Sequence, residues 1–138
     1  MQIKTASWFS QLPPGHVMVG ISRSVSHQPA PGYRMYRRLA PGPCFNSLKT
    51  EEYCRRYQAL LDQFAPYRTV KALQALARGG IPVMVCYEQA GSGQWCHRAL
   101  VASWIAAATG LPVPEVGYEH LPQDQHPLLP PLRRGIAA

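Results

Sequence analysis

The sequence predicts an α/β fold: a small, Rossmann-like three-layer sandwich whose mostly parallel sheet is covered by helices. Two continuous apolar runs, 17–21 and 81–87, are typical of parallel strands that are buried on both faces. A helical pattern at 96–109 and a short apolar segment at 113–116 follow the second run. Strand, helix and strand in this order predict a βαβ unit, which is right-handed in nearly all known cases.

The remaining elements are predicted from weaker or longer patterns. Residues 2–7 alternate weakly between polar and apolar, which favours a short first strand. An amphipathic helix begins near Thr50, a good N-cap, and continues to about residue 64. A second helix is predicted over 67–78 because two glycines follow it. Residues 26–46 hold several prolines without any period, and long loops of this kind are often functional.

Length and composition indicate one domain. A chain of 138 residues is expected to form a single α/β domain over 1–116, followed by a Pro-rich C-terminal tail over 117–138 that wraps over the surface or frays. Charged residues make up 15% of the chain, which excludes a highly charged disordered protein. The sequence has no apolar run of membrane-spanning length and no basic start before an apolar core. We therefore expect a cytoplasmic protein without a membrane partner.

The charge balance indicates an anionic partner. The formal net charge is +7, and 11 of the 14 cationic side chains are arginine. Arginine favours planar, two-point contact with phosphate or carboxylate. An anionic small molecule or a nucleic acid is therefore the predicted partner, although such a charge can also serve solubility alone. The absence of an export signal predicts that the four cysteines are thiols rather than a disulfide framework.

Polar clusters follow both buried strands, where ligands of parallel sheets bind. Ser22 and Arg23 follow the first strand, and Cys86 and Glu88 end the second. A glycine-containing loop then leads to the next helix, which opens with a cysteine, a histidine and an arginine. We expect these clusters to meet in one crevice. The candidate site residues are Ser22, Arg23, Cys86, Glu88, Cys96, His97 and Arg98.

Each candidate has a chemical and a structural interpretation. Cys96, at a helix N-terminus beside cationic side chains, is a nucleophilic thiolate or a small residue that fits a buried position. Glu88 is a general acid or base, or the partner of an arginine. His97 is a proton shuttle, or is hydrogen-bonded to loop backbone. Arg98 and the helix N-terminus are expected to form the main anion site, which Arg23 completes unless Glu88 simply pairs with Arg98.

Other site types match the sequence less well. Cys86, Cys96 and His97, with Glu88 or His126 as a fourth ligand, suggest a metal site. The nine residues between the two thiols are not zinc-finger spacing, so no metal is assigned.

Phosphate-binding and base-stacking motifs are incomplete or ambiguous. A phosphatase loop needs an arginine where Ser92 stands, and the glycines at 91 and 93 lack the third glycine of a dinucleotide motif. Residues 33–38 interleave tyrosines and arginines, which suits nucleic-acid stacking or an ordinary loop whose aromatics anchor to the core.

The chain resembles the bacterial domain-of-unknown-function-488 family over about residues 3–116. The most specific match is Cys86-Tyr87-Glu88 followed within ten residues by Cys96-His97-Arg98. Softer matches are Ile21-Ser22-Arg23, Leu39-Ala40-Pro41, Tyr53, Tyr57, the segment 100–105 and Val116. The resemblance implies a compact Rossmann-like α/β fold with a site at these residues, and it implies no particular reaction.

Two classes of function follow from these residues. The first is an enzyme that acts on a nucleotide, nucleoside or other anionic or phosphorylated substrate. Glu88, Cys96 and His97 would then carry the chemistry, while the substrate is bound by Ser22, Arg23, Cys86 and Arg98. The second is a non-catalytic module that binds a nucleotide or a nucleic acid. The sequence assigns no cofactor and no oligomeric state.

Overall fold

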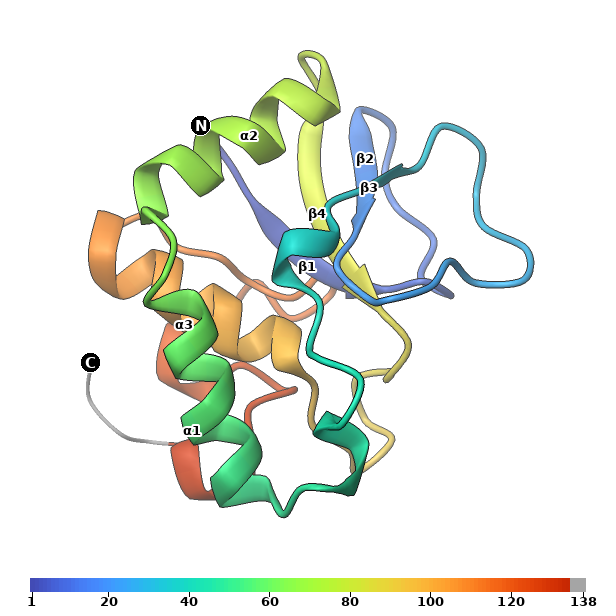
Figure 1. Cartoon of the computed structure of the whole chain (residues 1–138). Coiled ribbons are helices and arrows are strands. Elements are labelled where there is room, and N and C mark those ends of the chain that lie inside the picture. The colour runs from blue at the N-terminus through green and yellow to red at the C-terminus, as the bar shows by residue number, and fades with distance from the viewer. Residues whose placement is uncertain (135–138) are drawn as a thin grey trace.

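The computed structural model describes residues 1–134 and confirms the α/β class (Figure 1). Within these residues, one four-stranded parallel sheet has the order β1-β4-β2-β3. Its strands are β1 (Lys4–Ser7), β2 (His16–Gly20), β3 (Arg34–Met35) and β4 (Ile81–Cys86). The α-helices are α1 (Thr50–Leu61), α2 (Pro66–Ala77) and α3 (His97–Thr109).

The central strand β4 is the most apolar segment of the sheet, as its predicted burial requires. The chain leaves it through α3 and returns beside β1, as the predicted βαβ unit demands. The expected strand at 113–116 is reduced to one parallel bridge between Thr5 and Glu115. Pro112 and Pro114 lack the N–H group that a longer ladder would need, so pairing stops there.

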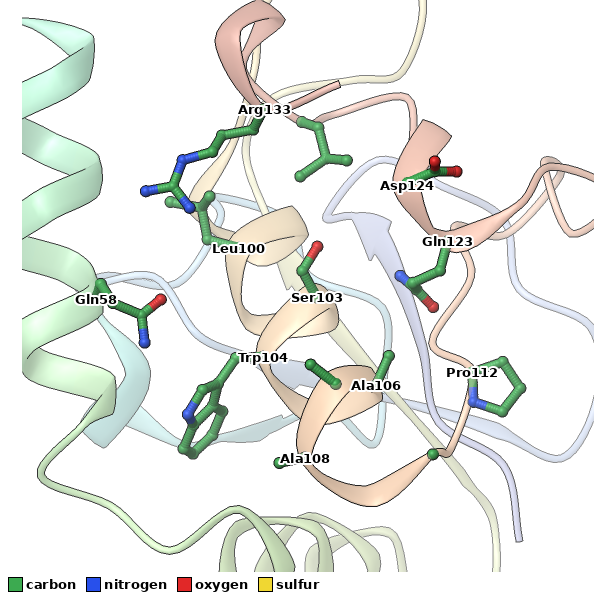
Figure 2. A pocket seen from close by; sticks show the side chains of 13 residues that line it. Gln58, Leu100, Ser103, Trp104, Ala106, Ala108, Pro112, Gln123, Asp124 and Arg133 are labelled. Carbon is green, nitrogen blue, oxygen red and sulfur yellow. The ribbon is translucent and has the colours of Figure 1, made fainter. Parts of the chain in front are cut away.

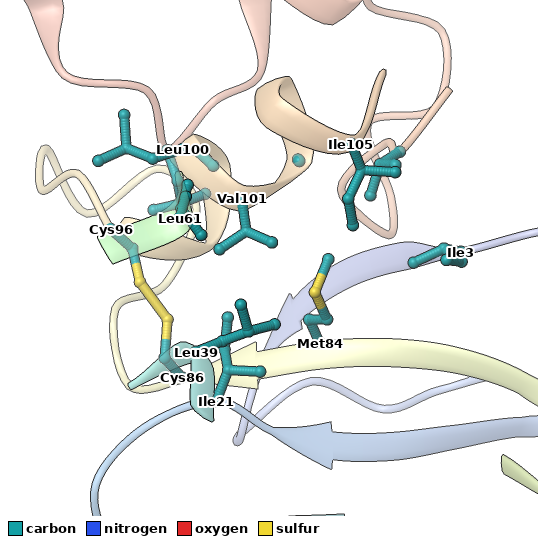
Figure 3. Packing of buried hydrophobic residues seen from close by; sticks show 14 of the residues in the cluster. Ile3, Ile21, Leu39, Leu61, Met84, Cys86, Cys96, Leu100, Val101 and Ile105 are labelled. Atoms are coloured by element: carbon teal, nitrogen blue, oxygen red, sulfur yellow. A yellow bond between two sulfur atoms is a disulfide. The ribbon is translucent and has the colours of Figure 1, made fainter. Parts of the chain in front are cut away.

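The helices lie on one face of the sheet, where they enclose the main core (Figure 1). Side chains from the strands meet side chains from all three helices there, as Figure 3 shows for Met84 of β4 and Val101 of α3. Fully buried members of this core include Ile3, Val19, Ile21, Leu39, Tyr57, Leu61, Leu73, Met84, Val101 and Ile105. Burial of this apolar surface is the main favourable contribution to folding.

Loop residues cover the opposite face of the sheet. Trp8, which follows β1, lies in a second apolar cluster with loop side chains such as Tyr33. Gly20 makes this packing possible, because a Cβ at that position would collide with the Trp8 ring and the Met35 sulfur. The third layer on this face is therefore built from loops in the described part of the chain.

The segment 26–46 contains more structure than its composition predicts. It holds the two-residue strand β3, which pairs with β2 at the edge of the sheet. Leu39 ends a short 3₁₀ turn and is fully buried in the main core. The Tyr57 hydroxyl of α1 donates a hydrogen bond to the Leu39 carbonyl, which attaches this loop to the helical layer.

The C-terminal segment is part of the core, although a surface tail was expected. Leu128 and Leu129 are buried in the main cluster, and the Leu128 carbonyl accepts a hydrogen bond from the Cys96 amide at 2.9 Å. The many prolines of 117–134 hide this role, since the segment has no regular apolar period. The last four residues of the expected tail lie outside the described residues. Within residues 1–134, no helix combines the length and apolar character needed to cross a membrane.

The burial of Leu128 yields a stability prediction. Leu128→Ala is expected to lower the free energy of unfolding by about 2–5 kcal/mol, because it leaves a cavity in the main core. The matched variant Leu132→Ala, four residues later at a 44% exposed position, is expected to change it by no more than about 0.5 kcal/mol. Urea denaturation measures both, and equal effects would contradict the placement of this segment.

Candidate functional site

The structure brings the two predicted polar clusters together at one edge of the sheet. Parallel pairing aligns Ser7 of β1 with Cys86, and Gly20 of β2 with Val85, so all three strands end at the same level. The Tyr87 hydroxyl then connects the two loops, since it lies 2.9 Å from both the hydroxyl and the carbonyl oxygen of Ser24. The edge where parallel sheets bind their ligands is thus formed by these loops and the start of α3.

Ser22 has a structural position within this edge. Its side chain is buried, and its hydroxyl accepts a hydrogen bond from the Trp8 indole at 3.0 Å. The same hydroxyl donates to the Ser24 carbonyl at 2.6 Å. Because the hydroxyl proton is already donated and the side chain is buried, Ser22 holds the loop after β2 in place rather than facing a ligand.

Cys86 and Cys96 are joined in a disulfide between the end of β4 and the start of α3 (Figure 3). Both residues are buried, with about 1% of their surface exposed. This corrects the expectation of free thiols and of a reactive Cys96 thiolate. That expectation rested on the absence of an export signal, which bears on the redox compartment of a protein. It gives no information on which cysteines the fold places side by side. Of the other cysteines, Cys44 is an exposed thiol and Cys54 a buried one.

His97 is held in one orientation by the loop after β2. Its Nε2 lies 2.8 Å from the Ile21 carbonyl oxygen, an acceptor, so Nε2 carries the proton and donates it. Its Nδ1 lies 3.7 Å from the Cys96 sulfur, and the Tyr57 ring packs edge-on at 5.4 Å. Burial lowers the pKa of His97 to about 4, despite the favourable bond to Ile21, and the charge of Arg98 lowers it further.

Arg98 is paired with Glu115, and this corrects the expected anion site. The guanidinium is fully buried and makes two hydrogen bonds to the Glu115 carboxylate, at 3.0 and 2.7 Å. Its Nη1 donates to the Cys86 sulfur at 3.1 Å. Of the two interpretations of Arg98, an anion site or a pair with a carboxylate of the chain, the structure shows the pair. Its partner is Glu115 and not Glu88. Arg98 cannot reach an anion in the crevice while it holds these bonds.

A buried polar network extends from this ion pair to β1 and to His126 of the C-terminal segment. The Thr5 hydroxyl of β1 donates to a Glu115 carboxylate oxygen at 2.7 Å and lies 2.7 Å from Nε2 of His126. The Leu128 amide donates to Nδ1 of His126, so the imidazole is neutral with its proton on Nε2, which donates to Thr5. Burial lowers the pKa of His126 to about 4, outweighing the nearby Glu115 carboxylate, and the Arg98 charge adds to the decrease.

Glu88, Arg23 and Tyr53 lie at this edge without being fully buried, and these three residues are named the rim of the site. Glu88 is half-buried, and burial raises the pKa of its carboxyl, while the charge of Arg98 and its own backbone amide oppose the increase. Arg23 is exposed at the end of the neighbouring loop. Burial raises the pKa of the Tyr53 hydroxyl well above its usual range, the charge of Glu88 raises it further, and that of Arg23 lowers it. Ionisable side chains from three elements therefore act on one another here.

The residues that sequence reasoning missed are Glu115, His126, Thr5 and Tyr53. Glu115 carried a weak signal, since an acidic residue inside an apolar segment such as 113–116 needs a buried partner. His126 was considered only as a metal ligand. Tyr53 entered the sequence analysis only as a soft match to the family, and its ring packs edge-on against Trp95 at 4.7 Å. No pattern in the sequence indicated the role of Thr5.

A large cavity lies away from this edge of the sheet. It has a volume of about 690 Å³ and lies between α1, α3 and the C-terminal segment (Figure 2). Gln58 of α1, Trp104 of α3 and Arg133 line it, together with several alanines of α3. None of the sequence-predicted site residues belongs to its lining.

Comparisons of this chain with protein-family models, with curated proteins and with solved structures give no match.

The buried His126 predicts how stability depends on pH. The pKa of His126 is about 4 in the folded chain and 6.5, the ordinary histidine value, in the unfolded chain. Between these two pH values the imidazole is therefore protonated mainly in the unfolded chain. The free energy of unfolding is expected to fall as the pH falls from 6.5 to 4. His126→Gln should reduce this slope by up to about 1.4 kcal/mol per pH unit, the value for one proton.

Urea denaturation at a series of pH values measures this slope. His97 contributes in the same window, so part of the slope is expected to remain in the His126→Gln variant. The control is His27→Gln, at an exposed position outside the network, and it should keep the slope of the parent protein. An unchanged slope in His126→Gln would contradict the buried neutral imidazole.

Proposed function

We propose that this chain is an enzyme that acts by acid–base chemistry on a nucleotide, a nucleoside or another small anionic or phosphorylated molecule. The observation that carries this proposal is the rim of Glu88, Arg23 and Tyr53 at the carboxyl edge of a parallel sheet. Such edges are where α/β proteins bind their ligands. A rim that combines a proton-transferring carboxyl with an exposed cation suits a substrate that carries negative charge.

Each rim residue has a distinct role in this proposal. Glu88 transfers a proton to or from the substrate, because a carboxyl whose pKa is raised by burial exchanges its proton closer to neutral pH. Arg23 holds the anionic group through two parallel N–H donors. Tyr53 keeps its hydroxyl proton, since its pKa is raised, and therefore donates a hydrogen bond to the bound anion.

The remaining predicted site residues support this rim. Ser22 fixes the loop that carries Arg23, through its bonds to Trp8 and Ser24. The disulfide of Cys86 anchors the strand end from which Glu88 extends. In this proposal the substrate contacts the rim, and the buried residues position it.

A second candidate is a module that binds nucleic acid without turnover. It is favoured by exposed arginines beside the rim, where Arg37 donates a hydrogen bond to the Arg23 carbonyl at 3.1 Å. The two tyrosines of the segment 33–38 are engaged within the fold: Tyr33 packs edge-on against Trp8 at 5.8 Å, and Tyr36 packs against the main core. Binding of this kind would be dominated by phosphate contacts and would weaken steeply with salt.

The enzyme proposal is tested by separating binding from turnover. A thermal-shift screen of nucleoside monophosphates, nucleosides and inorganic phosphate identifies compounds that bind the native state, and turnover of each is then measured. Glu88→Gln is expected to retain binding and lose about 100-fold or more in kcat. Arg23→Ala should lose about 1.5–3 kcal/mol of binding, at least about tenfold in Kd.

The matched control is Arg68→Ala, which removes an exposed arginine of α2 and should change neither quantity. Binding without turnover by the parent protein would favour the nucleic-acid or nucleotide-binding module instead. A Glu88→Gln variant with undiminished kcat, or a screen without a binding compound, would overturn the proposal.

A further inference from the structure

Three metal-ligating side chains meet beneath the rim, and the proposed function does not use them for chemistry. The sulfurs of Cys86 and Cys96 and a ring nitrogen of His97 all lie within 4.8 Å of one another. They come from two rigid elements, the end of β4 and the first turn of α3. All three residues are buried. A strand end and a helix start therefore present two sulfurs and one imidazole to a common point.

The imidazole is oriented as a metal ligand would be. His97 donates its Nε2 proton to the Ile21 carbonyl, which leaves an unprotonated Nδ1 on the side of the Cys96 sulfur. Histidines that bind metals nearly always donate their other ring N–H to a backbone carbonyl or a carboxylate in this manner. The bond to Ile21 thus selects the tautomer and the ring orientation that a metal ion requires.

The surroundings also suit thiolate ligands. Arg98 donates a hydrogen bond from Nη1 to the Cys86 sulfur at 3.1 Å, which is the kind of outer contact that orients a metal ligand. The bidentate pair with Glu115 fixes the guanidinium in that position. This second contact is independent of the histidine and points to the same centre.

The backbone spacing leaves room for an ion between the sulfurs. The Cα atoms of Cys86 and Cys96 are 7.5 Å apart, beyond the 4.4–6.8 Å that is usual for disulfides. When the bond is reduced, the two thiols no longer have to touch. Two sulfurs in a tetrahedral zinc site stand roughly 3.8 Å apart, as Zn–S bonds of about 2.3 Å imply.

We propose that, once a thiol or phosphine reductant has supplied two electrons and converted the Cys86–Cys96 disulfide to two thiols, the protein binds one zinc-class divalent ion through Cys86 Sγ, Cys96 Sγ and His97 Nδ1. Each thiol loses its proton when the ion binds, and the two thiolates balance the charge of the ion. Thiolate and imidazole ligands select Zn²⁺ over Mg²⁺ or Ca²⁺, which prefer oxygen. Three protein ligands leave one tetrahedral position for water or an anion, which is the arrangement of catalytic rather than structural zinc.

The proposed site differs from a zinc finger, the metal site against which the cysteine spacing was compared. The nine residues between the cysteines rule out a zinc finger, but the ligands are placed by a strand end and a helix start, not by a short knuckle. His126, considered from the sequence as a fourth ligand, is engaged by Thr5 and the Leu128 amide.

The proposal is tested with Co²⁺ as the probe. The full chain is reduced with a phosphine, freed of reductant under anaerobic conditions and titrated with Co²⁺. One equivalent is expected to bind with a sulfur-to-cobalt charge-transfer band and intense tetrahedral d–d bands, and Zn²⁺ should displace it. Cys86→Ser and His97→Gln are each expected to weaken binding by at least about 100-fold, because each removes a direct ligand.

Cys44→Ser, which removes an exposed thiol, is the matched control and should bind Co²⁺ as the parent does. Circular dichroism verifies that each variant is folded, and Cys96→Ala replaces any variant that is not. Three results would overturn the proposal: no stoichiometric band in the reduced protein, an unchanged band in the folded Cys86 and His97 variants, or loss of the band in Cys44→Ser. None of these readouts uses turnover, so they stand apart from the test of the Glu88 rim.

Discussion

The buried ion pair between Arg98 and Glu115 joins the first turn of α3 to the segment that pairs with β1. Two charges removed from water are tolerated only when their hydrogen bonds are satisfied, and here both carboxylate oxygens accept from the guanidinium. The same carboxylate accepts from Thr5 of β1, which in turn contacts His126 of the C-terminal segment. Removal of either charged partner would leave the other charge buried without a partner, and this typically causes a large loss of folding stability.

This pair also organises the candidate site. A cation in the first turn of a helix opposes the helix dipole, and the Glu115 carboxylate compensates for that placement. With Arg98 directed at Glu115, the two residues before it take other directions. Cys96 reaches the sulfur of Cys86, and His97 reaches the Ile21 carbonyl. The accessible groups are then left on the rim above, where the proposed acid–base chemistry takes place.

The sequence predicts the elements with regular patterns and misses the contacts that join them. The strands predicted at 17–21 and 81–87 lie within one residue of β2 and β4, because burial on both faces demands an unbroken apolar run. The C-terminal segment gives no such pattern, since its prolines break every period although Leu128 is buried. The partner of Arg98 was also missed, because a bond across 17 positions follows from topology and not from spacing.

The central claim, that Arg98 is a fixed structural cation and Arg23 the accessible one, is tested most directly by NMR of the arginine side chains. Hydrogen exchange at the Nε–H groups is measured while inorganic phosphate is added, and the Arg23→Ala variant assigns the Arg23 signal. The Arg98 signal is expected to exchange slowly and stay in place, whereas the exposed Arg23 signal exchanges rapidly and shifts with phosphate. An Arg98 signal that exchanges as rapidly as that of Arg23, or that moves with phosphate, would contradict the account.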